Sequence, residues 1–306
     1  YNTTIQTQTS TIRAEMEFNY DRKNLSEFNE LVNVNAVFKE SHLSTFDLKK
    51  LYDEISSDDI LRFDGDLKGS LNNFSLKNLQ LNSDKGIRIY GDFNFINAIK
   101  QEEFFLTANL EDVSADYDKL KSILPNLLGK TLPTEFKKLG KFSVTGFTKI
   151  TPKNIEATLE IESEIGEVIT DLELRDFASI DDAAYKGEVE LLRFDLEKFF
   201  NDPLVGKISF KGEVDGKGFR IENISTKLIG NVSQIEFSNY NYQNILVNGL
   251  YENNLFDGKL ESNDVNLNGS FEGLADLSEE VNKFDFKAII NYADLKALKL
   301  YNRDSI

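Results

Sequence analysis

The stretch "SNDVNLNGSFEGL", residues 262–274, decides what kind of protein this chain is. Residues 264–269 match D-x-N-x-N-G, the opening of a calcium-binding EF-hand loop. The same segment also alternates, because polar residues that would face the other way separate Val265, Leu267 and Phe271. The first pattern predicts an ion site between two helices. The second predicts a strand with one apolar face and one wetted face.

The calcium interpretation fails at the twelfth position of the loop. In an EF-hand that begins at Asp264, this position needs a bidentate carboxylate, and here it is Ala275. The flanking segments, 251–262 and 284–290, have the composition of strands rather than of helices. We therefore predict a turn followed by a strand, with the Asn residues on the solvated face.

Alternation with a period of two continues along most of the chain. Strands of this kind bury one face and wet the other, as in antiparallel sheets. Gly, Asn and Asp punctuate them, and "RFDGDLKG" at 62–69 and "VDGKG" at 214–218 are predicted to be hairpin turns. The sequence therefore predicts a mainly β fold of antiparallel strands with a few short helices. The clearest strands are "RAEMEFNY" (13–20), "GIRIYGDFNF" (86–95), "NIEATLEIES" (154–163), "KISFKGEV" (207–214) and "FDFKAII" (284–290).

Short helical signals recur, and each follows an alternating strand. In each of them an Asp suited to the N-cap precedes an apolar residue, and a second apolar residue follows three positions later on the same helical face. Because their spacing is irregular, we predict a loosely repeated architecture rather than a strict solenoid. The chain is then one continuous segment, 1–306, with approximate units 1–55, 56–130, 131–201 and 202–306. The helical stretches are 47–51, 116–120, 195–199 and 294–298.

The second of these stretches leads into the longest helical pattern, "YDKLKSILPNLLGKTLPTEFKKLGKF" at 117–142. Pro125 is predicted to bend this helix, because proline removes a backbone donor. A functional interpretation makes the helix a lid, a plug or a membrane-touching segment. We favour a helix that closes one end of the sheet, since apolar stripes usually mark contact with a core. The stripe consists of Leu120, Ile123, Leu124, Leu127 and Leu128.

The charge of the chain argues against several classes of partner. The formal net charge is −17, from 35 basic and 52 acidic side chains. A surface that binds nucleic acid needs a concentrated positive face. The longest basic cluster is the pair Lys137 and Lys138, with Lys141 nearby. We therefore predict no nucleic-acid partner, and the acidity also weighs against adsorption to an anionic lipid surface.

The residues needed for catalysis or metal binding are scarce. The sequence has no Cys, a single His at His42, no Gly-x-Ser-x-Gly motif and no phosphate-binding Gly loop. A zinc site would need two or three His or Cys ligands. Adjacent carboxylates carry little information among 52 acidic residues, and the lack of Trp argues against a sugar-binding platform. We predict a protein without enzymatic activity, metal or cofactor, in which His42 is a solvated loop or strand-end residue.

Phenylalanine occupies 24 of the 306 positions, mostly on the apolar side of the predicted strands. Few helices are available to cover those strands. The sheet must then either pack on itself as a sandwich or barrel, or bind something apolar along a curled and open face. From the residues alone, we favour the self-packed core.

The strand-turn-strand phrases carry a resemblance to a known family. They recur in 205–232 and 239–300, for example as "NGLYENNLFDG" and "DVNLNGSFEGL", and further upstream as "LPNLLG" (124–129), "KLGKFSVTG" (138–146) and "YKGEVELLRFDL" (185–196). In these phrases the chain resembles the periplasmic repeat region of TamB-like proteins of Bacteroidota, within the AsmA-like family. The likeness extends over essentially the whole chain, more faintly before residue 85. It is one of layout and phrase, not of catalytic residues.

The resemblance implies an elongated β-taco, which is a long sheet folded along its axis around a hydrophobic groove. It also implies a periplasmic location, in a parent protein anchored in the inner membrane by an N-terminal helix. The C-terminal domain of such a parent meets an outer-membrane barrel of the BamA type. The implied function is to carry phospholipid between the two membranes and to support outer-membrane protein assembly. The chain begins at Tyr1 in strand-like sequence, and we interpret it as a middle section of this bridge, without the anchor or the final domain.

In such a groove, the apolar residues would contact phospholipid acyl chains and perform no chemistry. Two rival functions stay open. The first is a scaffold or chaperone that holds nascent outer-membrane strands by edge pairing. The second is a β-rich spacer with a closed interior. The predicted groove-lining residues are Phe18, Phe93, Phe95, Leu106, Leu159, Ile161, Phe210, Phe237, Phe286 and Ile290.

Overall fold

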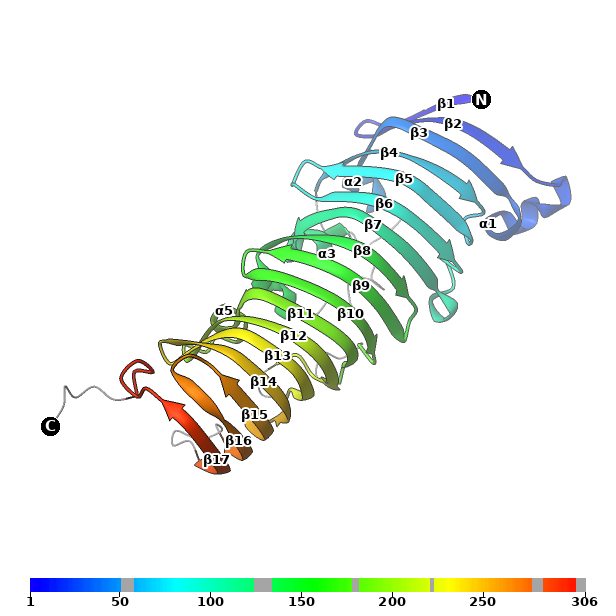
Figure 1. Cartoon of the computed structure of the whole chain (residues 1–306). Coiled ribbons are helices and arrows are strands. Elements are labelled where there is room, and N and C mark those ends of the chain that lie inside the picture. Colours follow the sequence, from blue (N-terminus) through cyan, green and yellow to red (C-terminus); the bar gives the residue numbers. More distant parts are fainter. Residues whose placement is uncertain (51–57, 124–133, 178–181, 221–222, 277–282, 301–306) are drawn as a thin grey trace. The chain divides into compact units, whose positions relative to one another are not determined.

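The chain divides into two compact units, Tyr1–Glu164 (unit 1) and Ile165–Ile306 (unit 2), which are described separately. The four-part division expected from the sequence stays a prediction. The computed structural model, drawn in Figure 1, describes residues 1–50, 58–123, 134–177, 182–220, 223–276 and 283–300.

Unit 1 is an antiparallel meander, in which each strand pairs with the next one along the chain (Figure 1). Its strands are β1 (Asn2–Gln6), β2 (Thr11–Asn19), β3 (Asn33–Ser44), β4 (Ile60–Gly69), β5 (Phe74–Ser83), β6 (Arg88–Ile96), β7 (Phe105–Asp116), β8 (Lys141–Ile150) and β9 (Asn154–Ser163). Its helices are η1 (Arg22–Glu27), α1 (Phe28–Leu31), α2 (Thr45–Leu48), η2 (Gln101–Glu103), α3 (Tyr117–Ile123) and η3 (Thr134–Leu139).

Unit 2 repeats the same construction with a second antiparallel meander. Its strands are β10 (Gly166–Arg175), β11 (Ala184–Asp195), β12 (Val205–Lys217), β13 (Ser225–Phe237), β14 (Tyr240–Glu252), β15 (Leu255–Asn263), β16 (Leu267–Asp276) and β17 (Lys283–Ala293). Helix α5 (Leu196–Phe200) lies between β11 and β12.

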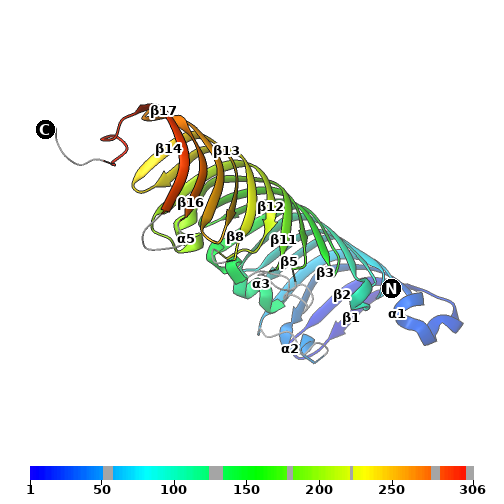
Figure 2. The ribbon, with the colours of Figure 1, turned by 90° about the horizontal axis from the view of Figure 1, so that it is seen from below.

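The predicted fold class is confirmed: the structure is mainly β, with antiparallel strands in a curled, open sheet and a few short helices. The self-packed sandwich or barrel favoured from the residues alone is wrong, because the sheet is not closed. Figure 2 shows the strands of each unit as arcs that bend in the same sense. A single layer that bends this strongly covers part of its own apolar face, so a second sheet is not needed to bury it.

Two of the predicted helical stretches form with the expected Asp at the N-cap. Asp116 Oδ1 accepts a hydrogen bond from Lys119 N–H (3.0 Å) at the start of α3. Asp195 Oδ1 accepts one from Lys198 N–H (3.0 Å) at the start of α5. A carboxylate in this position satisfies an amide that has no partner within the helix. Residues 124–133 of the long helical pattern, with Leu124, Pro125, Leu127 and Leu128, lie outside the described residues. The last part of the pattern differs from the prediction, because Thr134–Leu139 form the 3-10 helix η3 and β8 begins at Lys141.

The other two stretches differ from their predictions. In α2 the N-cap is Ser44, whose hydroxyl accepts from Phe46 N–H, and Asp47 lies inside the helix. Residues 295–299 form a turn rather than a helix, although Asp294 Oδ1 accepts from two amides of that turn. An Asp followed by helix-forming residues therefore marks a local cap, and tertiary contacts decide whether a helix follows.

Two predicted hairpin turns are also placed differently. Asp64 and Gly65 lie inside β4, at a register shift in its pairing with β5. In the second case β12 continues to Lys217, and the turn begins only at Gly218, which has a φ of 75°. The turn and strand predicted within 262–274 form, because a short turn joins β15 to β16 there. Val265, expected on the apolar face of the strand, instead lies in the turn and is 79% exposed.

Bulges interrupt the strand pairing, and side chains on neighbouring strands accept the amides that the bulges leave free. At the bulge in β3, Glu40 has a φ of 48° and its N–H donates to Asp64 Oδ1 (2.6 Å). Asn78 in β5 is held in the same way. In unit 2, Arg193 has a φ of 50° and its N–H donates to Ser209 Oγ (3.0 Å). Each bulge bends its strand, and the extra residue returns the apolar side chains to the same face.

Glycines occupy positions on the apolar face where a side chain would collide with the next strand. Gly187 has a φ of 145°, a conformation that is almost restricted to glycine. A Cβ atom on Gly212 would lie 2.6 Å from Gly230 Cα and 2.8 Å from Phe210 Cζ. These glycines allow neighbouring strands to approach closely where the sheet bends.

Replacing Gly212 with Ala should lower the free energy of unfolding by about 1–3 kcal/mol, because the added methyl group has no room beside Gly230 and Phe210. Denaturant unfolding of the purified protein measures this loss. Gly65→Ala is the matched control, since its Cβ would make ordinary contacts at 3.5 Å. The control should change stability by less than about 1 kcal/mol. Equal losses in the two variants would contradict the steric explanation.

Candidate functional site

One face of unit 1 carries unbroken rows of directly opposed, mostly apolar residues, and we call it the apolar face of unit 1. Successive strands are paired in such a register that each row crosses the sheet from β2 to β9. Phe74 and Phe95 are stacked within the first row, with ring centroids 4.6 Å apart. The first row is Phe18, Val34, Gly69, Phe74, Phe95, Leu106, Ile150 and Ile155. The second row is Met16, Ala36, Leu67, Leu76, Phe93, Ala108, Thr148 and Ala157.

Unit 2 has an apolar face of the same kind. Its rows cross from β10 to β17, and they contain more glycine than those of unit 1. One row is Val168, Leu191, Phe210, Val232, Ile245, Ser262, Gly269 and Ile290. Another row is Leu172, Gly187, Val214, Leu228, Gly249, Gly258, Gly273 and Phe286.

The predicted lining residues lie on the apolar faces of their units, but they differ in accessibility. Leu106 and Phe210 are only 4% and 7% exposed, so their side chains form the floor of the face. Phe18, Phe286 and Ile290 are 49%, 43% and 55% exposed. The floor residues stabilise the sheet, and the exposed ones are available to a ligand.

Strand pairing and burial show where the other predicted lining residues lie. Leu159 and Ile161 continue the alternation of β9, and Ile161 lies opposite Val144. Phe237 lies beyond a bulge in β13, two residues after Ile235, which packs against the buried cluster around Phe210. Phe93 and Phe95 are both half-buried.

Short helices cover the apolar face at one end of some strands. In unit 1, Leu120 of α3 packs against Ile87 and Val113. Helices α2 and α3 follow strands that run in the same direction, so they lie at the same edge of unit 1 (Figure 2). In unit 2, the rings of Phe199 in α5 and Phe194 in β11 pack edge to face, with centroids 5.3 Å apart. These helices close one end of the strands they follow and leave the middle of the face to the sheet itself.

The opposite face of each unit is mostly polar, with some exposed apolar residues such as Ile289, and directly opposed ion pairs lie along it. Lys149 Nζ is 2.7 Å from Glu156 Oε2 in unit 1. Lys186 Nζ is 2.8 Å from Asp215 Oδ2 in unit 2, and this hydrogen bond raises the pKa of Lys186. Ion pairs as exposed as these contribute little to stability, because water screens them. Their main consequence is to mark which face is in water.

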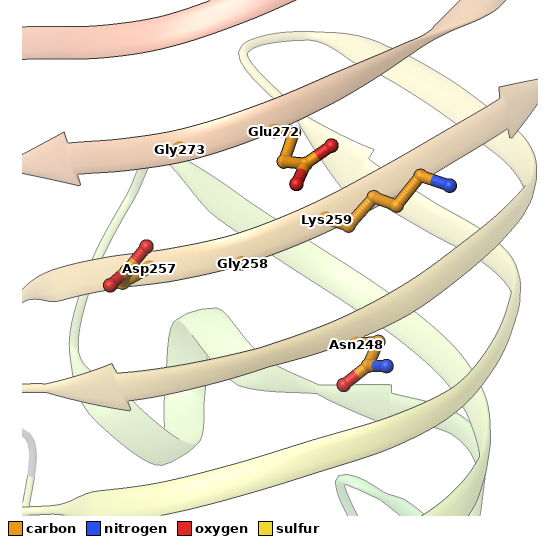
Figure 3. A pocket seen from close by; sticks show the side chains of 6 residues that line it. All are labelled: Asn248, Asp257, Gly258, Lys259, Glu272 and Gly273. Carbon is orange, nitrogen blue, oxygen red and sulfur yellow. The ribbon is translucent and has the colours of Figure 1, made fainter.

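A hollow of about 450 Å³ lies on the polar face of unit 2 (Figure 3). Asn248, Lys259 and Glu272 face each other across β14, β15 and β16, next to the side-chain-free positions Gly258 and Gly273. The hollow is the open space between these long polar side chains, above the backbone of the two glycines. Lys259 already forms an ion pair with Glu261, and the mixture of charges favours no particular ligand.

A second hollow, of about 300 Å³, lies in unit 1 between the first strands and α2. The hydroxyl groups of Ser10, Thr7 and Thr9 donate to Asp47 Oδ2 at 2.6, 2.5 and 2.8 Å. Together with Lys50, they hold the pKa of Asp47 well below its usual value. No spacing in the sequence indicates this network, because Asp47 is 37 to 40 residues away from its hydroxyl partners. The apolar lining of the hollow is Ile5, Ile12, Leu43 and Leu48.

The residues considered for metal binding have structural partners. Asp264 is buried, and its carboxylate accepts hydrogen bonds from Tyr240 Oη, Gln243 N–H and Asn266 N–H. His42 lies within β3, opposite Arg62. Across the described parts of the chain, no three His, Cys, Asp or Glu side chains are grouped so that they could hold a metal ion. Nor does any helix in those parts have the length and apolar content to cross a membrane.

The fold and the site together define a class: an open, bent antiparallel sheet with one apolar face, part of it accessible to ligands. Comparisons with protein-family models, with curated proteins and with solved structures found no match.

Phe210 and Phe286 should differ strongly in their contribution to stability. Replacing the buried Phe210 with Ala should cost about 3–5 kcal/mol, because it opens a cavity beside Val232 and Val247. Replacing the 43% exposed Phe286 with Ala should cost about 1 kcal/mol or less. The midpoints of denaturant unfolding measure both losses, provided that the dependence of the unfolding free energy on denaturant has the same slope in each variant. Similar losses would show that the apolar face of unit 2 is closed along its whole length.

The Asp47 network should make stability depend on pH. A carboxyl group whose pKa is lower in the folded than in the unfolded state stabilises the fold above its unfolded pKa, here 3.8, and loses this effect as the pH falls. The Tm of Asp47→Asn should therefore be below that of the native chain at pH 7, and the gap should narrow at pH 3. Asp21→Asn, at an exposed ion pair, controls for the loss of one charge. A gap that stays constant or widens at pH 3 would contradict this assignment.

Proposed function

We propose that the chain binds the acyl chains of phospholipid on its apolar faces, as a segment of a larger protein that carries lipid between the inner and outer membranes. The continuous register of apolar residues across each unit supports this proposal. A catalytic site would concentrate chemistry at one place, whereas these rows repeat the same apolar contact from strand to strand.

The energetics of a lipid tail favour a surface of this kind. Burial of a methylene group is worth about 0.8 kcal/mol, so exposing a tail of about fifteen methylenes to water costs on the order of 12 kcal/mol. A row of Phe, Leu, Ile and Val side chains offers a similar environment at each strand. A tail can then move along the row without leaving apolar contact, and its polar headgroup stays in water at the edge of the sheet.

The resemblance to TamB-like proteins supports the same proposal and gives it a cellular setting. In that setting the chain lies in the periplasm, and parts of the parent protein outside it meet the inner membrane and a BamA-type barrel. Support of outer-membrane biogenesis then follows from lipid supply.

Lipid capture should depend on the exposed residues of the apolar face. In the double variant Phe286→Asp/Ile290→Asp, the amount of co-purified phospholipid should fall at least about tenfold, because a carboxylate against an acyl chain costs more than about 1.4 kcal/mol. Native mass spectrometry, followed by lipid extraction from the same sample, measures the amount bound.

The matched control is the double variant Leu246→Asp/Ile289→Asp. Ile289 and Ile290 are adjacent and equally exposed, at 55%, but they lie on opposite faces of β17. The control should retain its lipid, and circular dichroism should show the same β content in both variants. Equal retention in the two variants, or no lipid in the native chain, would count against lipid binding. Photocrosslinking to unfolded barrel protein instead of lipid would point to the scaffold function.

A further inference from the structure

The last strand of unit 2, β17, has one free edge. Within the described residues it pairs only with β16, and Figure 1 shows it at the end of its meander. Its side chains are exposed on both faces from Lys283 to Tyr292. A long edge strand with exposed apolar side chains is a template for pairing with a further strand. The large apolar residues of β17, each between 43% and 58% exposed, are Phe284, Phe286, Ile289, Ile290 and Tyr292.

The free edge presents the backbone groups of residues on the apolar face. The carbonyl oxygen of Asp285 is directed at β16, because it is the atom nearest to the position that a Cβ on Gly273 would take. In an antiparallel strand the N–H and C=O of one residue point to the same side, and those of the next residue point to the other side. The pairing with β16 therefore leaves free the N–H and C=O groups of Phe284, Phe286 and Ala288.

Two side chains of opposite charge on the polar face of β17 also lack partners. Lys287 lies opposite Glu272 of β16, but neither it nor Asp285 forms an ion pair with the described part of the chain. Elsewhere on this face opposed charges pair across strands, as Lys186 does with Asp215. A strand that joins the free edge of β17 should therefore place a basic residue opposite Asp285 and an acidic residue opposite Lys287.

A second copy of β17 meets these requirements. We propose that two chains form a dimer by antiparallel pairing of their β17 strands, centred on Phe286, so that the sheet of unit 2 continues from one chain into the other. In this register Asp285 of each chain lies opposite Lys287 of the other, and the four charges alternate in sign around a square. Phe286 pairs with its copy and Phe284 with Ala288, so their free N–H and C=O groups exchange hydrogen bonds. Such an interface is isologous, as in most dimers of soluble proteins.

Charge selects this register among those that keep the apolar faces on the same side. Moving the centre of the pairing by one residue places either Asp285 or Lys287 opposite its own copy, and like charges directly opposed destabilise a strand pair. The dimer itself does not depend on the proposed lipid binding, because Asp285 and Lys287 lie on the polar face.

Charge reversal tests the pairing. The native chain should sediment as a dimer in analytical ultracentrifugation. In D285K, and equally in K287D, like charges face each other at both symmetric positions, so dimerisation should weaken at least about tenfold. The double variant D285K/K287D exchanges the charges and should dimerise like the native chain. A monomeric native chain, single variants that dimerise as well as the native chain, or a double variant that stays monomeric would overturn the proposal.

Cysteine crosslinking is a second readout that does not depend on charge, and the chain has no Cys of its own. In F286C the two introduced thiols face each other at the centre of the dimer, and a short bismaleimide should join the chains. I290C is the matched control, because Ile290 lies on the same face of β17 and is 55% exposed. It lies four residues from the centre, so the two thiols would be about 26 Å apart and should crosslink at least about tenfold less. Equal crosslinking of the two variants would contradict the register.

The lipid content of the same samples separates this proposal from the proposed function. D285K should keep its co-purified phospholipid while it loses the dimer, with the β content of the native chain by circular dichroism. A native chain that dimerises without lipid would support the dimer and count against lipid binding. A native chain that carries lipid as a monomer would do the reverse.

Discussion

The structure depends on bending an antiparallel sheet that has one apolar face and few helices to cover it. A flat layer would leave that face in water, and a closed barrel would bury it completely. Bending requires close approach between neighbouring strands, which leaves no room for side chains, and extra residues within strands, which leave backbone amides without a partner in the sheet. Glycine solves the first problem at positions such as Gly212. Side-chain acceptors such as Asp64 and Ser209, each one strand away from the bulge it serves, solve the second.

The same bending divides the apolar face into two kinds of residue. Side chains at the floor, such as Leu106 and Phe210, are covered by their neighbours and stabilise the sheet. Side chains near strand ends and on β17, such as Phe18 and Ile290, stay accessible. The sequence cannot separate these kinds, because both appear as apolar positions in an alternating strand. The difference arises from curvature, which is a property of many strands together.

Local patterns predicted much of the fold. The alternation in "NIEATLEIES" predicts β9 with the correct face buried, and Asp116 and Asp195 predict the start of their helices. Long-range pairing explains the failures. Asp64-Gly65 has the composition of a turn, yet its partners in β3 and β5 keep it inside a strand. The Asp47 network joins segments distant in the chain, so no spacing in the sequence reveals it.

Glycine on an apolar face has a cost for any ligand that moves over it, because it exposes backbone polar groups and leaves a gap. In unit 2 aromatic rings remove this defect. Phe210 lies over Gly212 and Gly230, where added Cβ atoms would be 2.8 and 2.7 Å from its ring, and Phe256 lies over Gly249 in the same way. Without such cover, each gap the size of a methylene would present a barrier of about 0.8 kcal/mol to an apolar chain. The rings that allow the sheet to bend around glycine thus also keep its apolar surface continuous, so one arrangement meets the demands of folding and of the proposed ligand.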